Sequence, residues 1–294
     1  MTQHPRQLEL ELNREKEKDR NHHLGGRSFY FFDFDDNVAF LSTPLYLFHR
    51  DNKSEIAISS GDFAQFHSFI GKSGTFKDYT IDYDDSVGTF RAFRDHHISD
   101  LEKLNGKKQI FIQDVAAALG FPDLAWKGPS WDCFFHATFN QRPVSVITAR
   151  GHHPQTIQNG IGVFVERGFL PNQPNYLSVF PVSHKETRAK LGDSEFTDSV
   201  ASLKQKAIRA SVQKALQIYG YSAHHRFGMS DDDPKNIQLV LEEMMRLKEE
   251  YPEMSFFIVE TQKGEYLKKE VLLQHNYREK KVAQRPEQIT LFES

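Results

Sequence analysis

Short apolar runs recur along the chain and are bounded by polar or turn-forming residues. Continuous runs of this kind are typical of strands that are buried on both faces of a sheet. They predict strands at 29–34, 143–149, 175–182, 225–232 and 254–261.

Between these strands, apolar residues recur at the spacing of a helix that buries one face. This spacing predicts helices within 113–121, 154–170, 198–221 and 234–252. Because strands and helices alternate from Pro143 onward, we predict an α/β fold with a parallel sheet and crossover helices.

Three stretches do not follow this pattern. Residues 1–27 are charge-rich and predict a polar tail or a solvated helix that ends at Gly25–Gly26. Residues 43–142 are irregular and rich in aromatic residues and histidine. Residues 281–294 are polar until "QITLF" at Gln288–Phe292.

Composition narrows the class of protein without naming a function. The 294 residues are 26% charged and 38% hydrophobic, as in an ordinary soluble globular protein. The net charge of -3 gives no whole-chain attraction to nucleic acid or membrane, although a local basic patch remains open. With one cysteine, Cys133, and no apolar run long enough for a signal peptide or a membrane span, we expect a cytoplasmic protein.

Acidic residues gather where the predicted strands end. Asp33, Asp35 and Asp36 follow an aromatic strand in "SFYFFDFDDNVAF", and no basic residue among them neutralises the charge. Thr148 ends another strand, and a third runs into the acids of 231–233. Because ligands bind outside the carboxyl ends of parallel strands, these side chains are expected to face one crevice.

This combination of groups predicts a magnesium and phosphate site. Mg²⁺ is held in proteins by a few carboxylates together with water and phosphate oxygens. A hydroxyl such as that of Thr148 and an ammonium such as that of Lys204 would hold phosphate oxygens and offset the remaining negative charge.

Four segments, in this order, resemble motifs of the haloacid dehalogenase-like (HAD) superfamily, chiefly its phosphatases. They are "FFDFDDNVAF", "VITARGH", "LKQKAI" and "GMSDDDPKNI", and together they span about Phe29 to Val259. The resemblance implies a Rossmannoid core with helices on both faces of a parallel sheet. It also implies Mg²⁺ as cofactor and a phosphorylated small molecule or nucleotide as substrate.

The resemblance assigns the two acids of the first motif to phosphoryl transfer. Asp33 would be the nucleophile that forms an aspartyl-phosphate intermediate. Asp35 would protonate the leaving oxygen and then activate water. The side chain of Asp33 and the backbone carbonyl of Asp35 would both contact Mg²⁺.

The second and third motifs would supply groups for the phosphate. Thr148 would hydrogen-bond a phosphoryl oxygen, and Lys204 would stabilise charge on the nucleophile and the phosphate. Lys206 competes with Lys204 for this role because the register of the helix is open. Arg150 lies just past a strand end, where contact with the substrate is expected.

The fourth motif would complete the metal site. Asp232 with Asn236 fits it best, and Asp231 is a further candidate ligand. Asp233 is expected to cap the next helix, with Pro234 in the first turn. Two neighbours of the first motif depart from the family pattern, because Asp36 replaces a frequent glycine and Asn37 replaces a threonine or valine.

The resemblance also divides the chain. Residues 28–42 and 143–280 would form the catalytic core, and residues 43–142 an inserted cap domain that covers the site and selects the substrate. Residues 1–27 and 281–294 would be polar tails.

The last pentapeptide and the cap leave other functions open. "QITLF" resembles the peptide with which bacterial replication and repair proteins dock on the DNA sliding clamp, although Leu291 and Phe292 would equally serve to pack on the protein itself. The docking peptide and the aromatic cap suggest a nucleotide or nucleic-acid end phosphatase linked to DNA repair. A third hypothesis is a binding protein that keeps the fold without catalysis.

Overall fold

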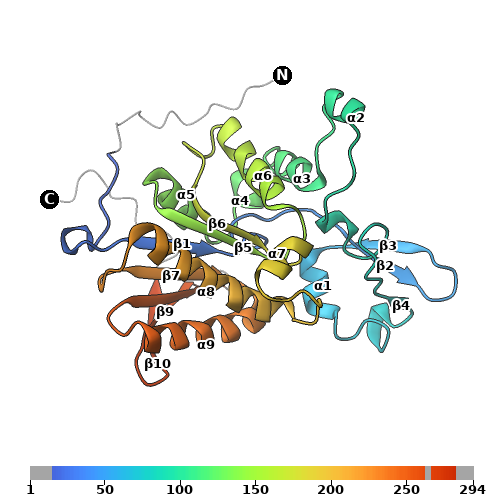
Figure 1. The fold of residues 1–294 in the computed structure, drawn as a ribbon. Helices are drawn as coiled ribbons and strands as arrows, with labels where there is room; N and C mark the ends of the chain where they lie inside the picture. The colour runs from blue at the N-terminus through green and yellow to red at the C-terminus, as the bar shows by residue number, and fades with distance from the viewer. Residues whose placement is uncertain (1–14, 262–265, 283–294) are drawn as a thin grey trace.

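The structure is a computed structural model that describes residues 15–261 and 266–282 (Figure 1). Its central sheet has seven strands in the order β10-β9-β8-β7-β1-β5-β6. In chain order these are β1 (Ser28–Phe32), β5 (Pro143–Thr148), β6 (Asn175–Pro181), β7 (Arg226–Asp231), β8 (Ser255–Glu260), β9 (Tyr266–Leu272) and β10 (Asn276–Val282).

Most of this sheet is parallel, which confirms the predicted α/β class. Strands β6, β5, β1, β7 and β8 run parallel, and β9 and β10 add an antiparallel hairpin at one edge. From β1 the chain builds outward first through β5 and β6 and then, on the other side, through β7 and β8. The strand order therefore reverses between β1 and β7, and ligands bind at such a switch point.

Helices pack on both faces of the sheet. On one face α8 (Val200–Tyr219) and α9 (Pro234–Glu250) share a core with Phe29 and Phe31 of β1. On the other face α3 (Ile110–Ala118), α5 (Trp131–Phe139) and α6 (Pro154–Glu166) share a core with Phe32. Alternate residues of a strand point to opposite faces, so the aromatic run of β1 fills both cores.

The remaining helices are short and lie in connections. They are α1 (Ser60–Phe66), α2 (Asp100–Leu104), α4 (Asp123–Trp126), α7 (Lys185–Lys190) and the 3-10 turns η1 (His22–Leu24), η2 (Gly74–Phe76) and η3 (Arg91–Phe93). In the described part of the chain, no helix is both long and apolar enough to cross a membrane.

The predicted insertion at 43–142 is set apart only in its first half. Strands β2 (Leu45–His49), β3 (Glu55–Ile58) and β4 (Tyr79–Thr80) form a second sheet, which lies to one side of the central sheet in Figure 1. This sheet has a small core of its own. The second half differs from the expectation, because α5 packs on β1 and β5 and α3 packs on α6, so both helices share the core on one face of the central sheet.

The segment before β1 packs on the core over its described residues. The Asp19 carboxylate forms an ion pair with Arg142 at 2.9 Å, and the Asn140 side chain accepts from the Glu17 amide at 2.7 Å. Residues 15–18 have no regular secondary structure and are not helical. At the other end, β10 continues to Val282, so the sheet extends slightly beyond the predicted start of the C-terminal tail.

Candidate active site

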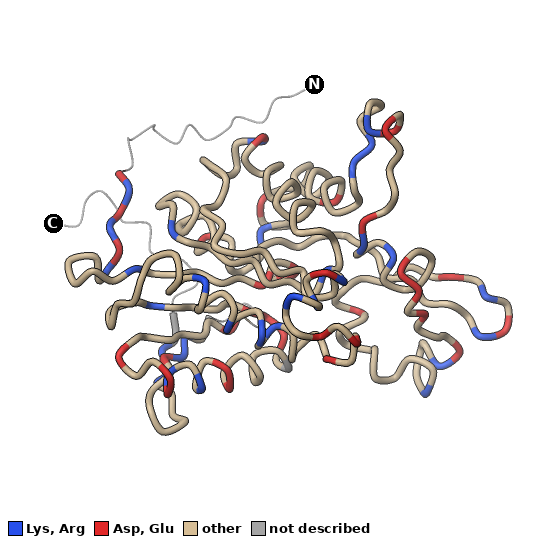
Figure 2. Tube along the Cα trace, viewed as in Figure 1, with Lys and Arg blue, Asp and Glu red and all other residues tan. Residues whose placement is uncertain are grey.

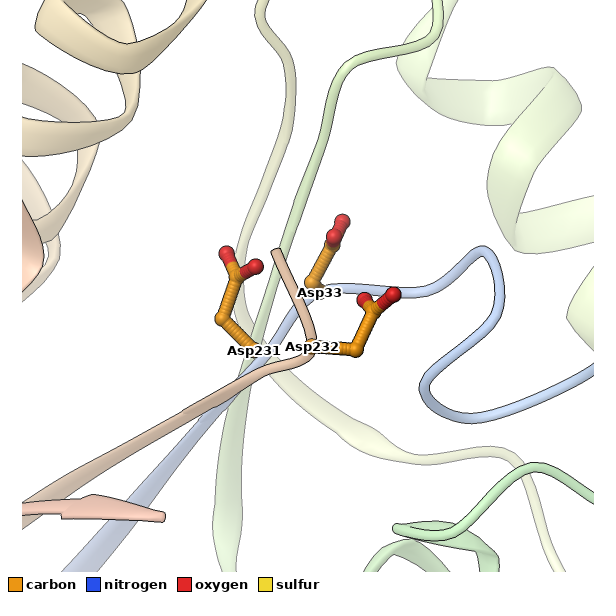
Figure 3. A group of neighbouring side chains, drawn as sticks. All are labelled: Asp33, Asp231 and Asp232. Atoms are coloured by element: carbon orange, nitrogen blue, oxygen red, sulfur yellow. The ribbon is translucent and has the colours of Figure 1, made fainter. Parts of the chain in front are cut away.

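Three carboxylates meet at the switch point. Asp33 directly follows β1, Asp231 ends β7, and Asp232 is the next residue. The ladder between the two strands continues past β1, since the Asp33 amide donates to the Ser230 carbonyl at 2.9 Å. One oxygen of each carboxylate lies within 4.8 Å of the others, and all three side chains point to the same side of the strand ends (Figure 3).

Lys204 of α8 bridges two of these carboxylates. Its Nζ donates to Asp33 Oδ2 at 2.8 Å and to Asp231 Oδ2 at 2.9 Å, and its side chain is only 1% exposed. Lys206 is half-exposed and pairs with Asp198 instead. The structure therefore brings Lys204, and not Lys206, to the acids.

The cluster holds more negative charge than its one ammonium balances. Burial raises the pKa of Asp33 well above its usual range, and Asp231 and Asp232 raise it further against the opposing effect of Lys204. Burial, followed by Asp231 and Asp36, raises the pKa of Asp232 to about 7. Burial alone would lower the pKa of Lys204, but the Asp231 and Asp33 carboxylates outweigh it and raise that pKa.

The remaining oxygens of the two bridged acids are held by neighbouring groups. Asp33 Oδ1 accepts from the Phe34 amide at 2.9 Å. Asp231 Oδ1 accepts from the Asp233 amide at 3.0 Å and from Asn236 Nδ2 at 3.4 Å. The Asp233 carbonyl accepts from the Ile237 amide, which places Asp233 at the N-cap position of α9.

Asn37 is a residue that sequence reasoning noted only as a departure from the family pattern. It is fully buried, and its Nδ2 donates to the carbonyls of Asp33 and Ser230 at 3.1 and 3.0 Å. Its Oδ1 accepts from the hydroxyls of Ser130, Thr261 and Ser230. Asn37 thus ties the ends of β1 and β7 together, and an amide side chain is required because it must both donate and accept.

Asp35 and Thr148 lie together beside the three carboxylates, but Asp35 pairs with Arg150 and not with Lys204. The Asp35 carboxylate forms a two-pronged ion pair with Arg150, with Nε at 2.9 and 3.0 Å and Nη2 at 2.7 Å. The Thr148 hydroxyl donates to Asp35 Oδ2 at 3.2 Å. Both predicted phosphate-handling groups are therefore engaged with each other.

Arg150 is buried rather than exposed at the strand end, and its predicted contact with the substrate stays a prediction. It is only 1% exposed, and its guanidinium lies 4.6 Å from the ring centres of both Phe93 and Phe111. Its Nη2 also donates to the Thr43 hydroxyl at 2.7 Å. Aromatic residues of η3 and α3 close over the strand end, so Arg150 holds Asp35 instead of facing outward.

Asp36 connects the site to the second sheet. Its backbone is left-handed, with φ at 57°, which aspartate tolerates better than most residues. Its carboxylate accepts from the Ser60 hydroxyl of α1 at 2.9 Å. A shift of α1 would therefore directly displace the loop that follows Asp33 and Asp35.

A separate cavity of about 610 Å³ lies away from these acids, between the α2–α3 connection and α6. Its lining includes His96, Lys107, Gln109 and Glu166, but none of the three carboxylates. The residues that the sequence singled out for metal and phosphate, Asp33, Asp231, Asp232 and Lys204, lie at the switch point, so we place the candidate site there.

Comparison with protein-family models, with curated proteins and with solved structures finds no match for this chain. The function is therefore argued from the site itself.

The charge imbalance predicts a pH dependence of stability for the protein in EDTA. Because the folded pKa of Asp232, about 7, lies above the ordinary aspartate value of 3.8, folding takes up a proton. This contribution to stability is complete below about pH 4 and is lost as the pH rises through 7. Asp232 is therefore expected to lower the free energy of unfolding in urea between pH 5 and pH 8, against the opposite contribution of His152, whose pKa burial lowers to about 2.

Asp232→Asn is expected to remove part of that fall and to raise the stability at pH 8, since each unit of pKa shift corresponds to about 1.4 kcal/mol. Asp51→Asn, in an exposed turn, is the matched control and should change neither value. If the Asp232→Asn variant kept the parent's pH dependence, the raised pKa of Asp232 would not be what lowers the stability at high pH.

Proposed function

We propose that this chain is a Mg²⁺-dependent phosphomonoester hydrolase of the HAD type that acts through an aspartyl phosphate on Asp33. The proposal rests on one observation. Asp33, Asp231 and Asp232 lie together at the switch point of the sheet, where Lys204 pairs with two of them. These residues come from the first, third and fourth of the segments that resemble the family, and the second supplies Thr148 beside Asp35.

The donor set fits a small divalent cation. Three carboxylates share one ammonium, and carboxylate oxygens are the ligands that Mg²⁺ prefers. Asp33, Asp231 and Asp232 would hold the ion, and Asn236 would keep Asp231 in place. The predicted contact of the Asp35 backbone carbonyl remains a prediction. When bound, Mg²⁺ would neutralise charge that develops on the phosphoryl oxygens.

The phosphate ester is hydrolysed in two steps, transfer of the phosphoryl group to Asp33 and its release to water. A carboxylate oxygen of Asp33 attacks phosphorus, the bond from phosphorus to the ester oxygen breaks, and the leaving oxygen takes a proton from Asp35. Asp35 then accepts a proton from a water that attacks the same phosphorus, which frees inorganic phosphate and regenerates Asp33. Lys204 holds Asp33 in position throughout.

The ion pair of Asp35 with Arg150 sets a condition on the acid step. Both oxygens of the Asp35 carboxylate already accept hydrogen bonds from Arg150, and one of them also accepts from the Thr148 hydroxyl. Asp35 must therefore leave Arg150, at least in part, before it protonates the leaving group. We propose that movement of the β2–β4 region, which is the best candidate for a cap, is coupled to this change through Asp36 and Ser60.

A phosphatase screen over metabolites and phosphorylated oligonucleotides, with Mg²⁺ or with EDTA, tests the proposal. We expect turnover of at least one phosphomonoester that requires the divalent ion. Faster hydrolysis of 3′- or 5′-phosphorylated oligonucleotides than of sugar phosphates would identify a nucleic-acid end phosphatase. Absence of turnover across the panel would favour a non-catalytic binding protein. The clamp-like peptide Gln288–Phe292 lies outside the described residues, so docking remains a prediction.

A further inference from the structure

One face of the sheet carries a group of cations at the end formed by β7 to β10. Phe256 and Ile258 of β8 lie in the core with α9, so Phe257 and Val259 point to the opposite face. The helices that pack on that opposite face, α5 and α6, lie over β1, β5 and β6. In the described part of the chain, we find no comparable helix over β8 and β9 there.

The strand register places the cations together. Lys268 of β9 lies beside Val259, and Lys280 of β10 lies directly opposite Lys268. Arg278 lies two residues before Lys280 and so points the same way, and Arg226 begins β7 on this face. We call Arg226, Lys268, Arg278 and Lys280 the basic sheet face; one acid, Glu270 of β9, shares it and lies between Phe257 and Arg278. Figure 2 marks the lysine and arginine positions along the trace, including those of β9 and β10.

Two of these cations are crowded by like charge. The Arg226 guanidinium and the Lys268 ammonium lie over the Phe257 ring, at 4.9 and 4.1 Å from its centre. Burial and then the charge of Arg226 lower the pKa of Lys268, although Glu270 opposes this. Like charges opposite one another on neighbouring strands are unfavourable, as Lys268 and Lys280 are.

Nothing in residues 15–261 and 266–282 forms an ion pair with any of the four. Lys269, the next residue of β9, faces α9 and does pair with Glu260. Lysine on an edge strand prevents edge-to-edge pairing, which accounts for Lys280 of β10. It does not account for Arg226 and Lys268, which lie on interior strands.

We propose that the basic sheet face binds the phosphate backbone of a single-stranded nucleic acid. The four cations extend over three inter-strand spacings, roughly 14 Å, which suits a row of phosphates better than one small anion. The face is charged and its aromatic residue is covered, whereas the centre of a protein–protein interface is apolar. Guanidinium groups also stack on unpaired bases. The proposal does not depend on the catalytic one.

Fluorescence anisotropy of a labelled oligothymidylate tests this with the full chain in EDTA, so that catalysis plays no part. We expect binding at low salt. The logarithm of the binding constant should fall linearly with the logarithm of the salt concentration, with a slope of about -3 for four contacted phosphates. The double variant Arg226→Gln, Lys268→Gln should bind roughly tenfold more weakly or worse, with a shallower slope. Lys72→Gln, Lys77→Gln removes the same charge from exposed sites elsewhere and should bind like the parent.

A second double variant, Arg278→Gln, Lys280→Gln, changes only exposed residues, so it still tests the proposal if the first variant does not fold. It should also weaken binding. Absence of binding at low salt would overturn the proposal, as would equal losses in the Lys72 and Lys77 control. Equal competition by polyaspartate would overturn it too, because the face would then serve an acidic protein segment.

Discussion

The Asp33→Asn variant is expected to release phosphate from an aryl phosphate roughly 10⁴-fold more slowly than the parent protein, or not at all, while it still folds. Asparagine keeps the shape of the side chain but cannot attack phosphorus as a carboxylate does. Folding should survive because the variant removes a buried charge whose pKa burial already raises. Initial rates with Mg²⁺ and circular dichroism spectra provide the measurement.

Asp36→Asn is the matched control for this loss. Asp36 is three residues away in the same loop, and asparagine also tolerates its left-handed backbone. Its carboxylate accepts from Ser60 and is not one of the three that meet at the switch point. We expect Asp36→Asn to retain most of the activity, because the asparagine oxygen can still accept from the Ser60 hydroxyl that links this loop to α1. Full activity in Asp33→Asn, or equal loss in both variants, would refute the assignment of Asp33 as nucleophile.

Lys204→Met is expected to lower the free energy of unfolding by roughly 3 kcal/mol or more at pH 8 in EDTA. Methionine is of similar length, but it leaves Asp33 and Asp231 buried without the ammonium that both now contact. Breaking a buried ion pair by removing one partner is costly because the other charge stays buried. The measurement is urea unfolding followed by circular dichroism.

Lys206→Met, on the same helix, should change the unfolding free energy by about 0.5 kcal/mol or less, because Lys206 is half-exposed and its pair with Asp198 lies at the surface. The cost of Lys204→Met should also be smaller at pH 5 than at pH 8. Without the ammonium, the already raised pKa of Asp33 rises further, and a protonated acid needs no partner. Equal effects of the two variants would mean that Lys204 does not hold the cluster together.

Much of the central sheet could be predicted because its strands are continuous apolar runs. Burial on both faces leaves few polar residues in β1, β5 and β8, and such runs stand out in a sequence. The position of Asp33 beside Asp231 followed from the general rule that parallel strands end at one edge. The choice between Lys204 and Lys206 required the helix register, which spacing alone did not fix.

The β9–β10 hairpin was not predicted because its turn lacks the usual residues. Gln274 and His275 both have positive φ, at 64° and 53°, where glycine or asparagine would be expected. The charged residues of both strands also resemble a solvated segment. As a result, the cations that now define the basic sheet face could not be placed on a common surface.

The roles of Arg150 and Asn37 depend on contacts between distant segments. Arg150 has the sequence context of an exposed strand end, but Phe93 and Phe111 come from elsewhere to enclose it. Asn37 links the strand ends because the fold brings Ser130 and Thr261, which are distant in the sequence, beside its side chain. Neither environment leaves a periodic signal in the sequence.

Trapping the intermediate tests the central claim most directly. The protein is quenched during turnover of its best phosphomonoester with Mg²⁺, reduced with borohydride, digested and analysed by mass spectrometry. Borohydride converts an aspartyl phosphate to homoserine, so we expect homoserine in place of Asp33, only when substrate and Mg²⁺ are both present. Phosphate release with Asp33 unmodified, or with homoserine at Asp231 or Asp232 instead, would contradict it.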